Sequence, residues 1–150
     1  MLFKLSKTQQ ITGNIYVVRS LISNFFIYSD VRTTICFDTG FIPSVVNREL
    51  KKINIEPKSV SHVFLTYPSF YHAGCIQLFK NADIYFSDEI PLKKSGKIMF
   101  SCKSEKNEKY KKLKDGDVVD IDGIKIKSIV FPKHKLGSMS YMVNDDILFI

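Results

Sequence analysis

The first third of the chain alternates short apolar stretches with polar breaks, a pattern typical of β-strands. β-Branched and aromatic residues are concentrated at 15–20, 24–29 and 33–37, and these residue types favour strands. The polar run 29–32 predicts the tight turn of a hairpin between the second and third strands.

The middle of the chain changes to a mixed pattern. Pro43 opens a segment in which apolar residues recur at i, i+4 and i+7 as far as Ile53, which predicts an amphipathic helix. An apolar strand at 60–66, a short helix at 73–79 and a strand at 83–87 follow. This β-α-β-α-β alternation predicts right-handed crossovers and a sheet that is at least partly parallel and covered by helices.

The last third returns to hairpins. Apolar stretches at 118–121 and 124–131 flank Asp122-Gly123, a strong two-residue hairpin signal. We expect two more strands, at 138–143 and 147–150, to pair about the polar turn between them.

Length and composition indicate one globular domain spanning residues 1–150, with 45% hydrophobic and 25% charged residues. No uncharged apolar stretch approaches the roughly 18 residues that a membrane span needs, and the first ten residues do not resemble a secretory signal. The odd number of widely spaced cysteines predicts reduced thiols rather than a disulfide framework. We therefore expect a cytoplasmic protein without membrane contact.

The net charge of +7 is concentrated in one segment. Residues 93–114 hold nine lysines against two glutamates, and the charges of the remaining chain cancel. Because this Lys-rich segment has no apolar face, it is interpreted as a solvated variable loop or short helix. A second interpretation is a patch for a polyanionic partner such as nucleic acid, bound weakly, salt-dependently and without sequence preference.

Candidate chemistry lies where the predicted strands end, because ligand sites in open α/β sheets gather beyond the carboxyl ends of the strands. Polar residues stand there at Asp38, in the loop 66–72 and in the loop 134–138. These loops hold two of the three histidines. The third, His62, lies within a strand pattern and is assigned a structural role.

Four motifs in this order resemble the metallo-β-lactamase superfamily. They are F-D-T-G at 37–40, V-F-L-T-Y-P-S-F-Y-H-A-G at 63–74, L-K-D-G-D at 113–117 and P-K-H-K-L-G-S at 132–138. Their order and spacing match along the whole chain. The resemblance implies an α/β (α+β) fold, the αββα sandwich of two sheets flanked by helices.

The resemblance also implies a zinc hydrolase site, but its ligand positions are mostly replaced. The family motif is Thr-His-x-His-x-Asp-His. Here Tyr67 and Ser69 stand in place of two histidines, and Tyr71 stands in place of the aspartate. His72 keeps the last motif position, and His134 falls where the family has the histidine of its Gly-His-Thr motif.

These replacements predict weak or absent zinc binding. Catalytic zinc sites need at least three protein ligands of the imidazole, thiolate or carboxylate type, and only His72 and His134 qualify. Lys133 and Lys135 add positive charge that opposes a dication. Cys75 is a possible third ligand by spacing, but a buried apolar thiol is the favoured interpretation.

Two hypotheses follow from these residues. In the first, the chain is a metallo-β-lactamase-fold pseudoenzyme with absent or altered hydrolytic activity and an unidentified small-molecule ligand. In the second, it is a non-catalytic binding module for a polyanion, using the Lys-rich segment 93–114. Asp38 and Gly40 are assigned to organising their loop rather than to chemistry. The tyrosines at the motif positions either line a pocket or fill the vacated cavity.

The family pattern continues beyond Ile150, with a Gly-Asp and a later histidine that this sequence does not contain. The run D-I-L-F-I at 146–150 ends in apolar residues with no polar residue after them. Unpaired apolar edges recruit other chains. We therefore expect a fold that is incomplete at its C-terminus. The chain would then either self-associate through its C-terminal strands or form part of a longer protein.

Overall fold

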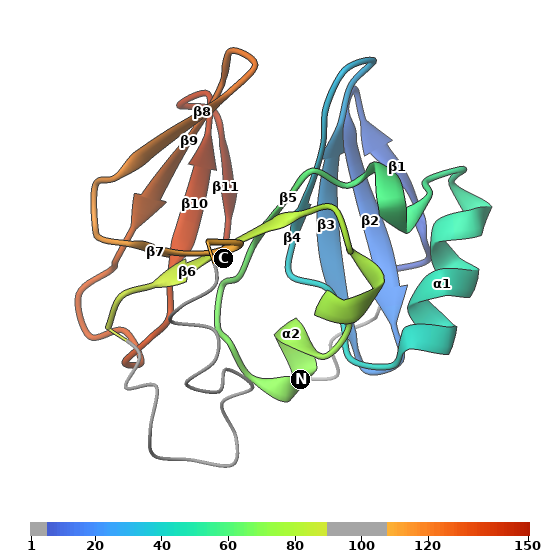
Figure 1. Cartoon of the computed structure of the whole chain (residues 1–150), viewed down its shortest axis with the longest axis horizontal. Coiled ribbons are helices and arrows are strands. Elements are labelled where there is room, and N and C mark those ends of the chain that lie inside the picture. The colour runs from blue at the N-terminus through green and yellow to red at the C-terminus, as the bar shows by residue number, and fades with distance from the viewer. Residues whose placement is uncertain (1–5, 90–107) are drawn as a thin grey trace.

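Two β-sheets face each other in the computed structural model, which describes residues 6–89 and 108–150 (Figure 1). The first sheet has seven strands in the order β1 to β7, and the second has four in the order β11-β10-β9-β8. In chain order the elements are β1 (Gln9–Thr12), β2 (Ile15–Ser20), β3 (Ser23–Ser29), β4 (Thr34–Phe37), α1 (Pro43–Lys52), η1 (Pro57–Ser59), β5 (His62–Phe64), α2 (Phe70–Ala73), η2 (Ile76–Leu78), β6 (Asp83–Ser87), β7 (Tyr110–Leu113), β8 (Val118–Ile121), β9 (Ile124–Ile129), β10 (Ser140–Val143) and β11 (Ile147–Phe149).

The seven-stranded sheet combines both strand directions. Strands β1 to β4 pair antiparallel through short connections, whereas β4 to β7 pair parallel through longer crossovers. This mixed sheet confirms the prediction of opening hairpins followed by a β-α-β-α-β unit. Strand β1 was missed, because all four of its side chains are exposed and it therefore lacks an apolar alternation.

Alternate residues of the central strands supply two separate cores. In β4, the Cys36 side chain joins the cluster beneath the helices, whereas Ile35 and Phe37 join the cluster between the sheets. In β5, Val63 and Phe64 divide in the same way. This two-residue period follows from the alternation of side chains across a strand.

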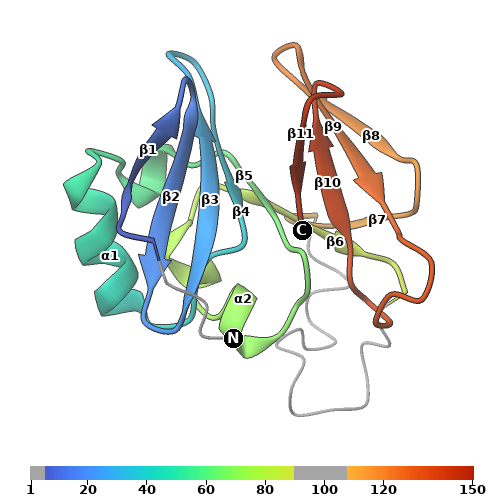
Figure 2. The same ribbon diagram turned by 180° about the vertical axis from the view of Figure 1, so that it is seen from behind.

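The helices lie on one face of the seven-stranded sheet. Figures 1 and 2 show α1 on the side away from the second sheet, and its Val46 and Leu50 are fully buried against that face. Ala73 of α2 belongs to the same core cluster. The α/β class and the sandwich of two sheets are confirmed. Within residues 6–89 and 108–150 the layers are helix, sheet and sheet, and no helix there is long and apolar enough to cross a membrane.

The short helix expected at 73–79 is wrong in its bounds. The chain instead forms α2 and the 3-10 turn η2, separated by a break after Gly74. A Cβ at Gly74 would lie 2.6 Å from the Phe70 carbonyl oxygen and 2.8 Å from the Phe41 Cα. Glycine thus permits a close backbone approach at the point where the helix ends.

The interpretation of the Lys-rich segment as a loop or helix is wrong for its last part. Tyr110–Leu113 is strand β7, paired parallel with β6. Lys111 lies 3.7 Å from Asp83 across this pair, and a central partner strand outweighs the low strand preference of lysine. Residues 93–107 of the segment lie outside the described residues, so its proposed binding to polyanions stays a prediction.

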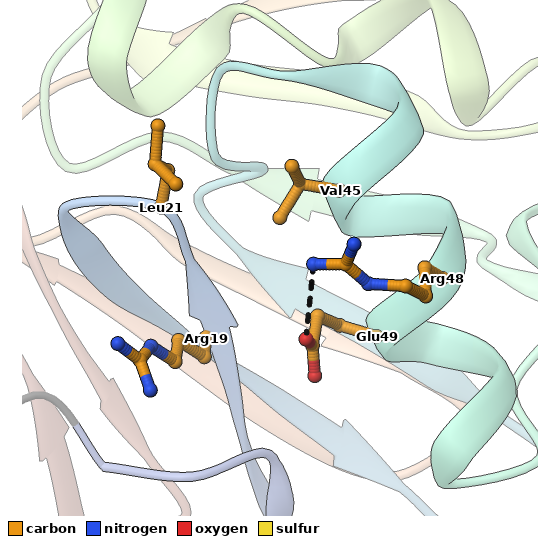
Figure 3. Close-up of a pocket in the computed structure, with 5 residues that line it drawn as sticks. All are labelled: Arg19, Leu21, Val45, Arg48 and Glu49. Atoms are coloured by element: carbon orange, nitrogen blue, oxygen red, sulfur yellow. Dashed lines mark ion pairs between the residues drawn. The ribbon is translucent and has the colours of Figure 1, made fainter.

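A buried carboxylate holds helix α1 against the start of the chain. Glu49 is only 5% exposed, and it accepts hydrogen bonds from the Thr8 hydroxyl (2.6 Å) and the Lys52 ammonium (2.9 Å). Figure 3 shows Arg48 directed toward Glu49, at 3.7 Å, while Arg19 on β2 extends away from the carboxylate. Burial opposes ionisation of Glu49, but these hydrogen bonds and cations outweigh it and lower the pKa of the carboxyl group.

Replacing this carboxylate should destabilise the fold in a pH-dependent way. We expect Glu49→Gln to lower the free energy of unfolding by about 1 kcal/mol at pH 7, because charge-assisted hydrogen bonds become neutral ones. The folded-state pKa lies below the unfolded value of about 4.3, so the contribution is complete above that pH and is lost as the pH falls through the folded-state pKa. Urea unfolding at several pH values measures the difference.

The exposed Glu56 provides the matched control. It has no ion-pair partner among the described residues, so Glu56→Gln should leave the unfolding free energy within about 0.5 kcal/mol of the native value. Equal effects of the two substitutions would show that the Glu49 contacts contribute no stability.

Candidate functional site

Asp38 connects the end of β4 to the motif loop that begins at Thr66. Its carboxylate accepts hydrogen bonds from the Thr66 backbone N–H (2.8 Å) and the Thr66 hydroxyl (2.6 Å). Its own N–H donates to the Phe64 carbonyl at 2.9 Å. The backbone φ of 69° lies in the left-handed region, which aspartate tolerates better than most residues.

The Asp38 carboxyl group is almost fully enclosed. Burial raises its pKa to about 6, against the opposing effects of the nearby His72 and of the Thr66 hydrogen bonds. The hydroxyl of Tyr141, on β10 of the second sheet, donates to the Leu65 carbonyl at 2.6 Å. Burial, with a smaller effect of the Asp38 charge, raises the pKa of Tyr141. Both sheets therefore meet around this carboxyl group.

The backbone after Asp38 binds the helical part of the motif. Thr39 donates to the His72 carbonyl from both its N–H (2.7 Å) and its hydroxyl (2.9 Å). The Cys75 N–H donates to the Thr39 hydroxyl (3.1 Å) and the Gly40 carbonyl (3.2 Å). Gly40 has a φ of +73°, and a Cβ there would lie 2.7 Å from the buried Ser20 Oγ. Only glycine fits at position 40 without displacing the neighbouring side chains.

Within the motif loop, His72 contacts Tyr67 and Ser69, two of the replaced positions of the sequence motif. The Ser69 hydroxyl lies 2.7 Å from His72 Nδ1. The Tyr67 ring stands edge-on to the imidazole, with centroids 6.4 Å apart. Lys135, from the loop that carries His134, places its ammonium 4.2 Å from the Tyr67 ring centroid, a cation–π contact. The structure thus brings Tyr67, Ser69 and His72 together and joins the two loops through Lys135.

Tyr71 belongs to a different surface. It is 52% exposed, and its ring packs on Phe41 at 5.3 Å between centroids. Phe70, equally exposed, lies 5.9 Å from Phe41. The residue at the position of the family aspartate is therefore part of an exposed aromatic patch rather than a pocket wall.

His134 uses both of its ring nitrogens in contacts with the protein. Nδ1 lies 2.7 Å from the Phe131 carbonyl oxygen, and Nε2 lies 2.8 Å from the Glu89 carboxylate. Both partners are hydrogen-bond acceptors, so this geometry favours the ring with both nitrogens protonated. The hydrogen bond to Glu89 is the largest of the effects that raise the pKa of His134. An imidazolium has no lone pair to offer a metal ion.

The donor set does not fit the two-metal site that the fold family implies. Among residues 6–89 and 108–150, no three His, Cys, Asp or Glu side chains converge in a way that could hold a metal ion. Cys75 is fully buried, and burial raises the pKa of its thiol to about 12, which disfavours the thiolate that metals require. Tyr67 and Ser69 offer neutral oxygens, which are poor zinc ligands.

Glu89 is the site residue that sequence reasoning missed. It lies two residues after the last residue of strand β6, and strand 83–87 was predicted with those bounds. Glu89 therefore stands at the same sheet edge as Asp38 and Thr66. Applying the carboxyl-end rule to this strand as well would have identified it. His62, by contrast, begins β5 at the opposite edge, where its Nδ1 contacts the Ser61 hydroxyl at 2.7 Å.

Two substitutions at position 38 separate hydrogen bonding from charge. Asp38→Asn should keep the unfolding free energy within about 1 kcal/mol, because asparagine tolerates positive φ, accepts from the Thr66 N–H and donates to the Thr66 hydroxyl. Asp38→Ala should cost about 2 to 4 kcal/mol, since it leaves the Thr66 N–H without an acceptor and strains the backbone. Denaturant unfolding measures both variants.

The pH dependence of stability separates the charge of Asp38 from its hydrogen bonding. The folded-state pKa of Asp38 is about 6 and the unfolded value is about 3.9. The folded state therefore keeps its proton to a higher pH than the unfolded state does. The contribution of this protonation to the free energy of unfolding is complete below the unfolded-state pKa and is lost as the pH rises through about 6. Asp38→Asn should lack this decline, and an identical decline in the variant would contradict the assignment to Asp38.

Comparisons with known proteins give a fold but no close relative. No protein-family model and no curated protein matches the chain. Among solved structures, the subclass B3 metallo-β-lactamase BJP-1 of Bradyrhizobium japonicum is 16% identical with a TM-score of 0.73, and the match covers 93% of this chain and 57% of that enzyme. MEM-A1, a subclass B3 metallo-β-lactamase from a soil metagenome library, is 18% identical with a TM-score of 0.68, over 93% of this chain and 56% of the other.

A metallo-β-lactamase of Cronobacter sakazakii with a HARLDQ motif is 15% identical with a TM-score of 0.69, over 93% of this chain and 58% of the other. This chain therefore spans less than two thirds of the length of the enzymes that it matches. Nearly all of this chain superimposes on each of these enzymes despite the low sequence identity. The chain has the metallo-β-lactamase fold.

Proposed function

We propose that this chain is a hydrolase-like domain of the metallo-β-lactamase fold whose site loops do not support two-metal hydrolysis. The observation that carries the proposal is the state of His134. Both of its nitrogens lie within hydrogen-bond distance of protein acceptors, one of them the Glu89 carboxylate at 2.8 Å. A neutral imidazole is the form that binds metals, and this ion pair stabilises the charged form instead.

The contacts of the other surviving histidine support the same proposal. Hydrolysis with two metals requires ligands that hold both ions and an open position for the attacking water. His72 Nδ1 is engaged by Ser69, and the adjacent Tyr67 is covered by the Lys135 ammonium. A cation at this point raises the electrostatic cost of placing a dication next to it. These contacts join the two loops to each other through side chains.

Zinc stoichiometry tests the proposal directly. The protein is equilibrated with zinc, dialysed and measured by elemental analysis, and hydrolysis of a chromogenic β-lactam is followed in parallel. We expect fewer than one zinc ion per chain and no hydrolysis above the buffer rate, because the ligand set is incomplete. His72→Ala and His134→Ala should retain as much zinc as the native protein.

His62→Ala is the matched control, since His62 lies at the opposite edge of the sheet. Two zinc ions per chain that disappear in His72→Ala but persist in His62→Ala would overturn the proposal. That outcome would show that His72 and further side chains of the protein rebuild the site, and the chain would then be a metal-dependent hydrolase.

A further inference from the structure

A hollow lies at the opposite edge of the seven-stranded sheet from the motif loop. It has a volume of about 420 Å³ and lies between the last turn of α1, the connection to η1 and the end of η2. Six of the residues that line it are Lys51, Ile55, Glu56, Lys58, Leu78 and Lys80. Hollows of about 300 to 1,000 Å³ are typical of small-molecule sites.

The apolar part of this lysine-rimmed hollow is continuous with the protein core. Ile55 is only 8% exposed and belongs to the core cluster beneath the helices, and Leu78 packs against that cluster. Hydrogen bonds to two backbone carbonyls hold the wall of the hollow. The Asn81 side chain donates to the Lys58 carbonyl at 3.0 Å, and the Ser59 N–H donates to the Glu56 carbonyl at 2.9 Å. An alkyl group placed there would meet a preformed apolar surface.

The rim of the hollow carries a net positive charge. Lys51, Lys58 and Lys80 come from three different segments of the chain, and Glu56 is the single acidic residue among those lining the hollow. None of the three ammonium groups pairs with a carboxylate of the described residues. Three like charges gathered around one apolar surface complement an anion.

The smaller hollow beside α1 differs in its charge balance. It measures about 180 Å³ and carries Arg19 and Arg48, but Glu49 lies in it as well (Figure 3). That carboxylate already pairs with Arg48 and Lys52. The smaller hollow therefore has a cation that is paired within the protein, whereas none of the three lysines of the lysine-rimmed hollow pairs with a carboxylate of the described residues.

We propose that the lysine-rimmed hollow binds a small amphipathic organic anion. Its alkyl or aryl body lies on Ile55 and Leu78, and its carboxylate or phosphate is held by the ammonium groups of the rim. Lysine binds such groups as a point charge without a fixed geometry, so the shared chemistry of the ligand is an apolar body with one anionic end.

This site is independent of the proposed function. η1 precedes strand β5, whereas Thr66 and the motif loop follow it. Ligand binding at the lysine-rimmed hollow should therefore be the same in the native protein and in His72→Ala. A failure of either proposal leaves the other standing.

Octanoate and octyl phosphate are the probes for this site, titrated into the ¹⁵N-labelled protein while backbone amide shifts are recorded. We expect saturable shifts at Ile55, Leu78 and Lys80 with both probes. Octanol lacks the charge and inorganic phosphate lacks the apolar body, so each should bind at least threefold more weakly. If octanol binds as tightly as octanoate, or if no amide around the hollow shifts, the proposal fails.

Charge-matched double variants complete the test. Lys51→Gln with Lys80→Gln should weaken octanoate binding about three- to tenfold, as expected for the loss of two exposed ion pairs. Lys125→Gln with Lys127→Gln removes the same charge from exposed positions of β9 on the other sheet. Equal weakening in both variants would show a general effect of net charge and would overturn the assignment to this hollow.

Discussion

The hydrogen bonds between Asp38 and Thr66 are the constraint on which the candidate site depends. Parallel strands β4 and β5 end side by side, and their outgoing loops must leave the sheet in defined directions. A carboxylate that accepts two hydrogen bonds from Thr66 fixes one loop to the other at 2.6 and 2.8 Å. Because the carboxyl group is buried, these bonds are not weakened by competing water. The positions of Tyr67, Ser69 and His72 follow from this attachment.

Much of the fold could be predicted because its strands obey simple alternation. The bounds of β2, β6 and β8 were obtained directly, since apolar residues and turn residues delimit them. Strand β7 could not be found in this way. Its sequence Y-K-K-L is dominated by lysine, and it forms because the edge of β6 offers hydrogen-bond partners. Tertiary pairing of this kind overrides local preference and leaves no pattern in the sequence.

For the candidate site, the sequence could suggest residues but not the contacts that they make. The carboxyl-end rule named Asp38, the motif loop and the His134 loop as candidates; the first two follow β4 and β5 of one sheet, and the His134 loop follows β9 of the other. It could not give the pairing of His134 with Glu89, because that depends on side-chain directions across 45 residues of sequence. Nor could it show that Tyr71 turns to Phe41, since both residues are simply aromatic in the sequence. Replaced motif positions thus keep their places in the backbone while their side chains acquire new partners.

The shared central strands have a consequence for how the molecule unfolds. Neighbouring residues such as Cys36 and Phe37 belong to different cores, so β4 cannot leave one core without leaving the other. The same holds for Val63 and Phe64 on β5. Two cores that share their strands residue by residue lack a boundary along which one could open alone. The helix layer and the two sheets should therefore unfold as one cooperative unit, although they enclose two separate cores.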